Sequence, residues 1–108
     1  MGYLQILTTV GKREDAERIA ETLVQKRLAG CVQIVGLISS IYWWKSKMEK
    51  AEEWLCLIKS EETPYHNVEE TIRKIHPYET PEIIAVSIVA GSKEYFRWLS
   101  QDLRLRKS

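Results

Sequence analysis

Residues 31–44 read CVQIVGLISSIYWW, a long run of β-branched and aromatic side chains that is typical of a β-strand. The two-residue alternation within it is imperfect. Val32 and Ile34 share one face, whereas Ile41 and Trp43 have the opposite parity. A glycine and two serines lie between these pairs, so we expect a bulge or bend that changes the phase of the strand.

The residues that follow predict the return of this strand as a β-hairpin. Ser46, Lys47 and Met48 form a candidate turn, and residues 54–60 form a second strand-like run. With a turn near Lys47, Cys56 should lie opposite about Ile38. The two cysteines, Cys31 and Cys56, should then not face each other.

A strand and a helix precede this hairpin. Residues 3–10 are short, rich in β-branched side chains and closed by Gly11, which is typical of a strand. An amphipathic helix follows, with Gly30 as its expected stop. Its apolar stripe consists of Ala16, Ile19, Ala20, Leu23, Val24 and Leu28.

The second half of the chain predicts a helix, a strand and a short last helix. Thr63-Pro64 is typical of a helix start, and His76-Pro77 of a helix end, because proline disfavours a helical residue before it. Residues 83–89 predict another strand. One face of the last helix would carry Tyr95, Trp98, Leu99 and Leu103.

The resulting order is β-α-β-β-α-β plus a C-terminal helix, within one domain spanning residues 1–108. This is an α+β class fold, the ferredoxin-like, split βαβ arrangement with an antiparallel sheet. Both crossovers should be right-handed, which places the first two helices on the same face of the sheet.

The strands carry more apolar surface than those helices can cover. Residues 54–58 and 83–86 are apolar at both parities, although a sheet covered on one face should alternate. The other face would expose a contiguous apolar patch, which monomers rarely tolerate. We therefore expect a homo-oligomer. The alternative is that the C-terminal helix alone shields that face.

Several segments resemble the CutA family, the divalent-cation tolerance proteins. The resemblance covers nearly the whole chain. Its most specific signature is the combination of Tyr-Trp-Trp-Lys at residues 42–45 with the stretch at residues 76–84. The segments are LAGCV at 28–32, IYWWK at 41–45, LIK at 57–59 and HPYETPEII at 76–84.

Membership of that family implies a ferredoxin-like fold, a compact homotrimer and a link to tolerance of copper and other divalent cations, with no established enzymatic reaction. The chain departs from the family pattern at Ser46, where glycine is usual, and at Ser60, where threonine is common. Some members have a cysteine and a second histidine where this chain has Thr8 and Ile75. Only His76 matches that set.

A divalent metal, copper first, is the cofactor that this resemblance implies. Soft metals prefer thiolate, imidazole or thioether ligands, and Cys31, Cys56, His66, His76 and Met48 supply these groups without zinc-finger spacing. The histidine of the HPYETPEII segment has nearby carboxylates and ends a helix, so it could bind a metal or make hydrogen bonds at a subunit boundary. The predicted ligand set is His76, Glu79, Glu82 and Cys31.

Aromatic side chains provide a second group of candidates, which we expect to pack at the subunit interface. An RNA-recognition domain with stacked bases is the competing interpretation, but the expected basic and aromatic motif is absent. The predicted interface residues are Tyr42, Trp43, Trp44, Trp54 and Tyr78.

Composition limits the possible partners. The chain has 16 basic and 15 acidic residues, and its only local cluster is Arg104, Arg106 and Lys107, so we expect no nucleic-acid partner. No apolar run approaches the ~18–20 residues of a spanning helix, and no signal peptide is visible, which favours the cytoplasm and reduced thiols. The sequence contains no catalytic triad and no phosphate-binding loop, so we do not expect an enzyme.

The alternative function is a trimeric signalling or scaffold module, similar to PII proteins, that binds a small molecule or partner protein in its inter-subunit clefts.

Overall fold

Four strands and three helices follow one another in the predicted order in the computed structural model, which describes residues 2–103. The ferredoxin-like fold is therefore confirmed. The basic cluster of Arg104, Arg106 and Lys107 lies outside the described residues. The elements are β1 (Tyr3–Val10), α1 (Arg13–Gln25), β2 (Cys31–Trp44), β3 (Lys47–Glu61), α2 (Tyr65–Ile75), β4 (Ile84–Ile88) and α3 (Lys93–Ser100).

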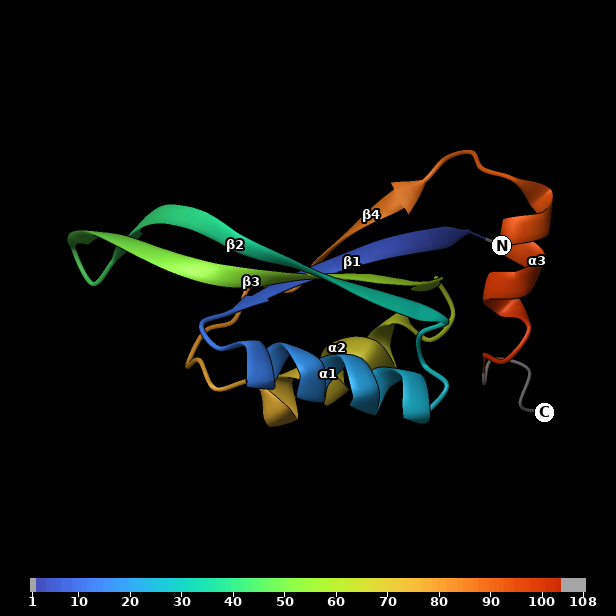
Figure 1. Ribbon diagram of the computed structural model, residues 1–108, viewed down its shortest axis with the longest axis horizontal. Helices are drawn as coiled ribbons and strands as arrows, with labels where there is room; N and C mark the ends of the chain where they lie inside the picture. Colours follow the sequence, from blue (N-terminus) through green and yellow to red (C-terminus); the bar gives the residue numbers. More distant parts are fainter. Residues whose placement is uncertain (1, 104–108) are drawn as a thin grey trace.

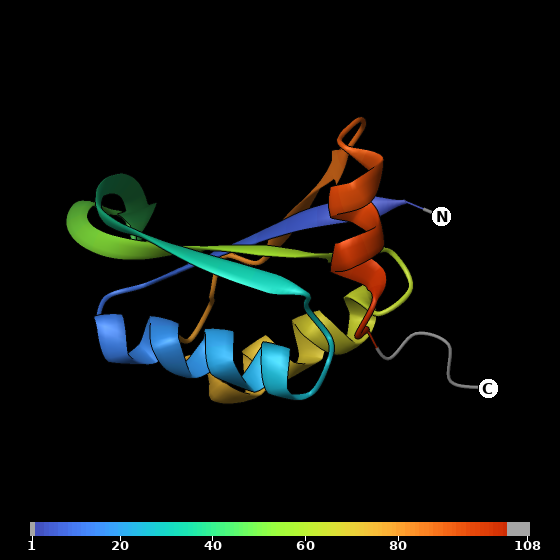
Figure 2. The same ribbon diagram turned by 45° about the vertical axis from the view of Figure 1, so that its right-hand side comes forward.

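The sheet has the strand order β2-β3-β1-β4, and each neighbouring pair is antiparallel. Helices α1 and α2 lie side by side against one face, as predicted (Figures 1 and 2). Helix α3 stands at one end of the sheet, where the Tyr3 ring stacks on Phe96 with 4.2 Å between centroids. The opposite end of the molecule is the tip of the β2–β3 hairpin.

Side-chain alternation along β1 explains where the core lies. Ile6 and Val10 are fully buried toward the helices, whereas Gln5 and Leu7 point to the other face and remain partly exposed. The helices contribute the apolar stripes that their spacing predicts. Their buried residues are Ala16, Ile19 and Leu23 from α1, and Val68 and Ile72 from α2.

The hairpin register differs from the prediction. Trp44 pairs with Lys47, so the turn is a tight two-residue one at Lys45 and Ser46, and β3 begins seven residues before the expected Trp54. The strand is longer than expected because the polar residues that follow the turn continue the ladder. The bulge is confirmed as a register shift in the middle of β2.

The cysteines are correspondingly placed differently than predicted. Cys56 lies opposite Ile34 rather than Ile38, because the turn comes earlier along the chain than we expected and the register shift in β2 moves the pairing by one more residue. Cys31 lies opposite Lys59, and both cysteines are free thiols. The prediction that they do not face each other is therefore confirmed.

Helix α1 ends before Gly30, the residue at which we expected it to stop. Arg27, with φ of 61°, takes the left-handed position that closes the helix, and the Leu28 amide donates to the Leu23 carbonyl. Gly30 instead lies against α3, where Leu99 leaves no room for a Cβ. The end of α2 before His76 agrees with the prediction.

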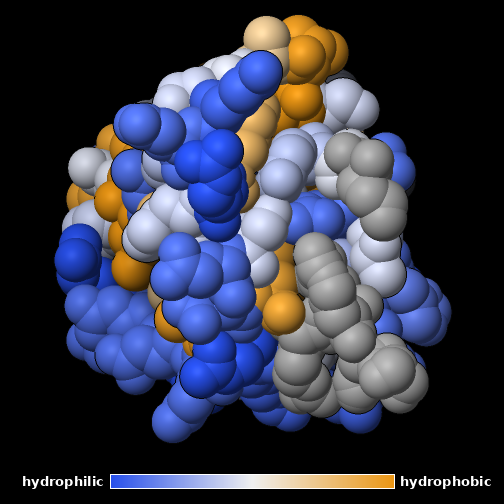
Figure 3. Space-filling view, turned by 90° about the vertical axis from the view of Figure 1, so that its right-hand side faces the viewer, coloured by the Kyte–Doolittle hydropathy of each residue, from blue (hydrophilic) through white to orange (hydrophobic). Residues whose placement is uncertain are grey.

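The helix-free face of the sheet remains largely uncovered. Helix α3 reaches only one end of it, and apolar side chains gather at the upper edge of that end, where β4 leads into α3 (Figures 1 and 3). Among the described residues, no helix is long and apolar enough to cross a membrane. Large apolar side chains at least 40% exposed in β2, the start of β3 and β4 include Val35, Leu37, Ile41, Trp43, Met48, Ile84 and Val86.

Candidate functional site

A cavity of about 590 Å³ lies between the β2–β3 hairpin and the segment that follows α2. The half of the hairpin nearest its turn forms one wall of the cavity, and residues 78–82, which follow α2, form the other. Five of the predicted site residues meet here, two from the metal set and three from the interface set. The lining consists of Thr9, Ser40, Ile41, Tyr42, Trp44, Glu53, Tyr78, Glu79, Thr80 and Glu82.

The innermost carboxylate is Glu53, which the sequence did not single out. It is only 5% exposed. Its oxygens accept hydrogen bonds from the Ser40 hydroxyl at 2.6 Å and from the Tyr78 hydroxyl at 2.7 Å. Burial and the neighbouring carboxylate raise the pKa of Tyr78 well above its usual value. The phenol therefore stays protonated and keeps donating to Glu53.

His76 is held by two hydrogen bonds that fix its tautomer. Its Nε2 lies 2.9 Å from the Thr9 carbonyl, which can only accept, so this nitrogen carries the proton. The Tyr78 amide donates to Nδ1 at 3.1 Å. Burial lowers the pKa of His76, partly offset by the Thr9 carbonyl and by Asp15 and Glu53. Within this chain, the neutral imidazole thus ties β1 to the motif after α2, and neither nitrogen offers a free lone pair.

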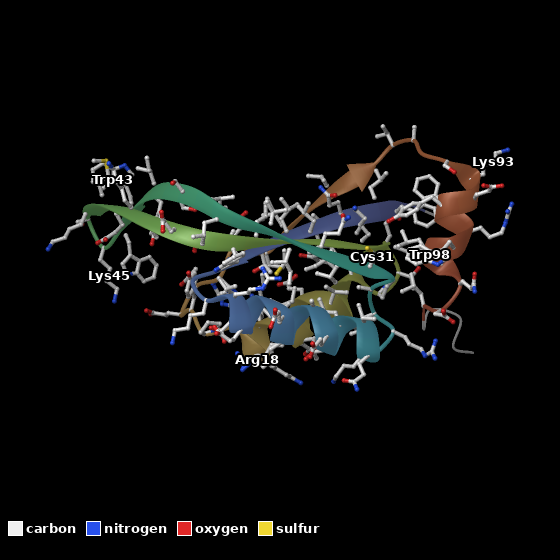
Figure 4. The ribbon with its side chains drawn as sticks, viewed as in Figure 1. Arg18, Cys31, Trp43, Lys45, Lys93 and Trp98 are labelled. Atoms are coloured by element: carbon white, nitrogen blue, oxygen red, sulfur yellow. The ribbon has the colours of Figure 1, made fainter. Side chains whose placement is uncertain are left out.

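The rim of the cavity carries an ammonium group of the chain itself. Lys45 Nζ lies 3.8 Å from a carboxylate oxygen of Glu79 and 5.4 Å from the centroid of the Trp44 ring. Figure 4 shows Lys45 at the hairpin tip, with Trp43 on the other side of the ribbon. The Lys45 and Glu79 side chains are both more than 70% exposed, so this ion pair is weak.

Of the four predicted metal ligands, the structure brings only Glu79 and Glu82 to the same cavity. Cys31 lies at the far end of the molecule, near the labelled Trp98 (Figure 4), with its thiol beside the Tyr95 hydroxyl. Cys56 is fully buried, and burial raises the pKa of its thiol to about 11. Within residues 2–103, no group of three or more His, Cys, Asp or Glu side chains could hold a metal ion.

The predicted interface aromatics divide into two groups. Trp43 is 74% exposed, and Tyr42 and Trp44 are also exposed. Trp54 instead packs against the core, with its ring over Gly36 and the Arg13 guanidinium 5.0 Å from its centroid. Tyr78, the fifth member of the set, is half-buried on Glu53, so it too has partners within the chain.

Comparison with known proteins gives a consistent result. A family model described as CutA1 divalent ion tolerance protein matches residues 4–102. The divalent-cation tolerance protein CutA of Thermus thermophilus is 39% identical over 97 residues, covering 90% of this chain and 94% of that protein. The chloroplastic protein CutA 1 of Oryza sativa is 35% identical, covering 92% of this chain. The chain spans only 56% of that plant protein.

Solved structures match over nearly the whole chain. The Cut A1 divalent cation tolerance protein of Thermus thermophilus superposes with a TM-score of 0.90 at 38% identity, covering 94% of this chain and 98% of that one. The Oryza sativa CutA1 structure gives 0.93 at 33% identity, covering 100% and 97%. The structure from Archaeoglobus fulgidus, described as a periplasmic divalent cation tolerance protein, gives 0.89 at 36%, covering 93% and 97%.

Proposed function

The chain belongs to the CutA1 divalent ion tolerance protein family, and we propose that it acts by binding a divalent metal ion as a homotrimer. The observation that supports this is the position of Glu79 and Glu82. Both carboxylates are exposed at the rim of a cavity whose opposite wall is the uncovered hairpin. A second copy packed beside that hairpin would bring further ligands to the two carboxylates and leave the cavity open.

Ligand chemistry bears on which metal this would be. Carboxylate oxygens suit hard cations such as Mn²⁺ and Mg²⁺, whereas copper prefers imidazole and thiolate. A copper site that uses His76 would have to break the hydrogen bond to the Tyr78 amide or the one to the Thr9 carbonyl. Cys31 could join it only from another subunit. Copper remains the first candidate from the family, with a hard cation as the competing one.

Metal titration of purified protein tests this proposal. We expect Glu79→Gln/Glu82→Gln to weaken binding of Cu²⁺ or Mn²⁺ at least tenfold in calorimetry. A matched pair on exposed α1 positions, Glu14→Gln/Glu21→Gln, should leave it unchanged. Equal affinity in both double variants would remove the rim carboxylates from the proposal.

The role of His76 needs its own comparison. His76→Ala should weaken copper binding selectively if the imidazole is a ligand, and His66→Ala is the control because that histidine is exposed on α2. Copper binding that is indistinguishable between His76→Ala and wild type would leave His76 with its structural hydrogen bonds only.

A second candidate function is a binding module for a small molecule, without a catalysed reaction. The cavity itself favours it, because about 590 Å³ lined by aromatic and polar groups is the size of an ordinary ligand site. A thermal-shift screen of metals against nucleotides, amines and organic acids separates the two. A stabilising metabolite without any metal response would favour this second function.

We also propose the cytoplasm as the site of action, since its reducing conditions would keep Cys31 and Cys56 as thiols. Fractionation of cells that express the protein checks this. Recovery in a membrane or extracellular fraction would contradict it.

A further inference from the structure

We propose that the cavity binds a primary alkyl ammonium group, such as one end of an aliphatic diamine, with Glu53 as its inner acceptor and the hairpin aromatics as its walls. This inference rests on the small-molecule function above and names the chemical class of its ligand. It does not depend on a metal site at the rim.

The buried carboxylate of Glu53 is the group that a bound cation would compensate. A carboxylate that is 5% exposed has lost most of its hydration, which is costly unless an opposite charge compensates it. The Ser40 and Tyr78 hydroxyls that donate to it are neutral, and none of the ion pairs within residues 2–103 involves Glu53. A carboxylate accepts about four hydrogen bonds, so an ammonium N–H still has an acceptor there.

The remaining lining excludes an anionic ligand. Glu79 and Glu82 add two carboxylates to the same cavity, and no Lys, Arg or His is among its lining residues. A phosphate or carboxylate ligand would meet the buried charge of Glu53 and the exposed carboxylates of Glu79 and Glu82. Of these two exposed groups, only Glu79 is ion-paired within residues 2–103, weakly, with Lys45. The cavity therefore selects cations by charge.

The aromatic walls favour an organic cation over a hydrated metal ion. Trp44, Tyr42 and Tyr78 line the cavity beside these carboxylates. The face of an aromatic ring attracts an ammonium group by about 0.5–2 kcal/mol, and it also packs against the alkyl chain that carries the group. A strongly hydrated metal ion gains nothing from such walls.

The chain supplies an example of this recognition. Lys45 Nζ, an alkyl ammonium, lies within 5.4 Å of the Trp44 ring centroid and 3.8 Å from Glu79, and both of these residues line the cavity. Lys45 thus shows that this rim accommodates a primary ammonium. It should also compete weakly with an external amine for the same groups.

Amine binding to the full chain tests the inference, with 1,4-diaminobutane as the probe. Choline is cationic but has no N–H donor, and 1,4-butanediol has the same chain length without charge. We expect calorimetry on the wild type to show binding of 1,4-diaminobutane at least tenfold tighter than of either comparison compound, because only the primary amine brings a charged N–H donor to Glu53. Choline binding as tightly would overturn the inference.

Two pairs of variants locate the site. Glu53→Gln should weaken amine binding at least tenfold, whereas Glu52→Gln, at the exposed neighbouring position, should not. Lys45→Ala should tighten it by roughly twofold to fivefold, the range of a weak exposed ion pair, because it removes the internal competitor. Lys47→Ala removes the same charge from the hairpin without the Trp44 and Glu79 contacts. Equal effects of the two lysine variants would overturn the inference that Lys45 competes with the external amine.

The outcomes separate this inference from the function on which it rests. If nucleotides or organic acids bind and amines do not, the ligand class is wrong while a small-molecule function stands. If no metabolite binds at all, both fail. The lysine pair and the choline comparison keep the test decisive even if Glu53→Gln does not fold.

Discussion

Thr8 shows how a single side chain limits the stability of this core. It is fully buried opposite Cys56, and its hydroxyl is the one buried side-chain polar atom without a hydrogen-bond partner among the described residues. We expect Thr8→Val to raise the free energy of unfolding by about 1 kcal/mol, because it removes an unpaired hydroxyl at constant shape. Urea unfolding checks this. Thr8→Ser, which keeps the hydroxyl and loses the methyl group, should be destabilising.

His76 links the stability of the same region to pH. Burial lowers its folded pKa below the unfolded value near 6.5, so the unfolded chain binds the proton more tightly. Stability should therefore be constant with respect to this group above about pH 7 and should fall as the pH drops below about 6.5. Protonation would also place a second donor against the Tyr78 amide.

Unfolding in metal-free buffer between pH 8 and pH 5 measures this dependence. His76→Gln should lose part of the acid-dependent decrease, whereas His66→Gln, at an exposed site, should retain the wild-type slope. A wild-type curve parallel to that of His76→Gln would mean that another group titrates.

The motif after α2 selected residues that the structure brings together. Tyr78, Glu79 and Glu82 line one cavity, and their roles at a subunit interface and as metal ligands stay predictions. Glu53 was not selected, because it lies in an acid-rich stretch of the hairpin beside Glu52, and nothing local distinguishes a buried carboxylate from an exposed one. Its burial comes from tertiary contacts, which no local pattern records.

At the scale of the elements, the hairpin turn has residues that differ from those its backbone conformation prefers. Lys45 and Ser46 have φ of 50° and 68°, the left-handed pair of a two-residue turn that prefers Asn-Gly. Ser46→Gly should raise stability by about 1 kcal/mol, since glycine adopts this conformation without the Cβ clash. Ser39→Gly, within extended β2, should instead lower it. Thermal unfolding at one fixed protein concentration compares them.

The same turn explains why element order was predictable and register was not. Hydrophobic periodicity identified the strands and helices, and it also located the bulge in β2. The exact turn depended on two non-glycine residues with positive φ, which sequence patterns do not favour. Arg27 at the end of α1 escaped prediction for the same reason.

At the scale of the whole molecule, the exposed apolar surface still requires a cover. Strands β2 and β4 are both edges of the sheet, and α3 shields only one end of the helix-free face. Apolar area removed from water contributes about 25 cal/mol per Å², so several half-exposed large side chains provide enough driving force for association. Light scattering should therefore give the trimer that we propose, three times the 12.6 kDa of one chain.

Two valines of similar exposure test which face of the molecule drives assembly. Val86 in β4 is 48% exposed on the helix-free face, and Val24 is 45% exposed on α1. Val86→Glu places a charge in the surface that would be desolvated, so it should shift the mass toward the monomer at micromolar concentration. Val24→Glu adds the same charge to the helix layer and should leave the mass unchanged. If both variants dissociate alike, net charge rather than burial of the helix-free face controls assembly, and a monomeric wild type would exclude assembly through this face.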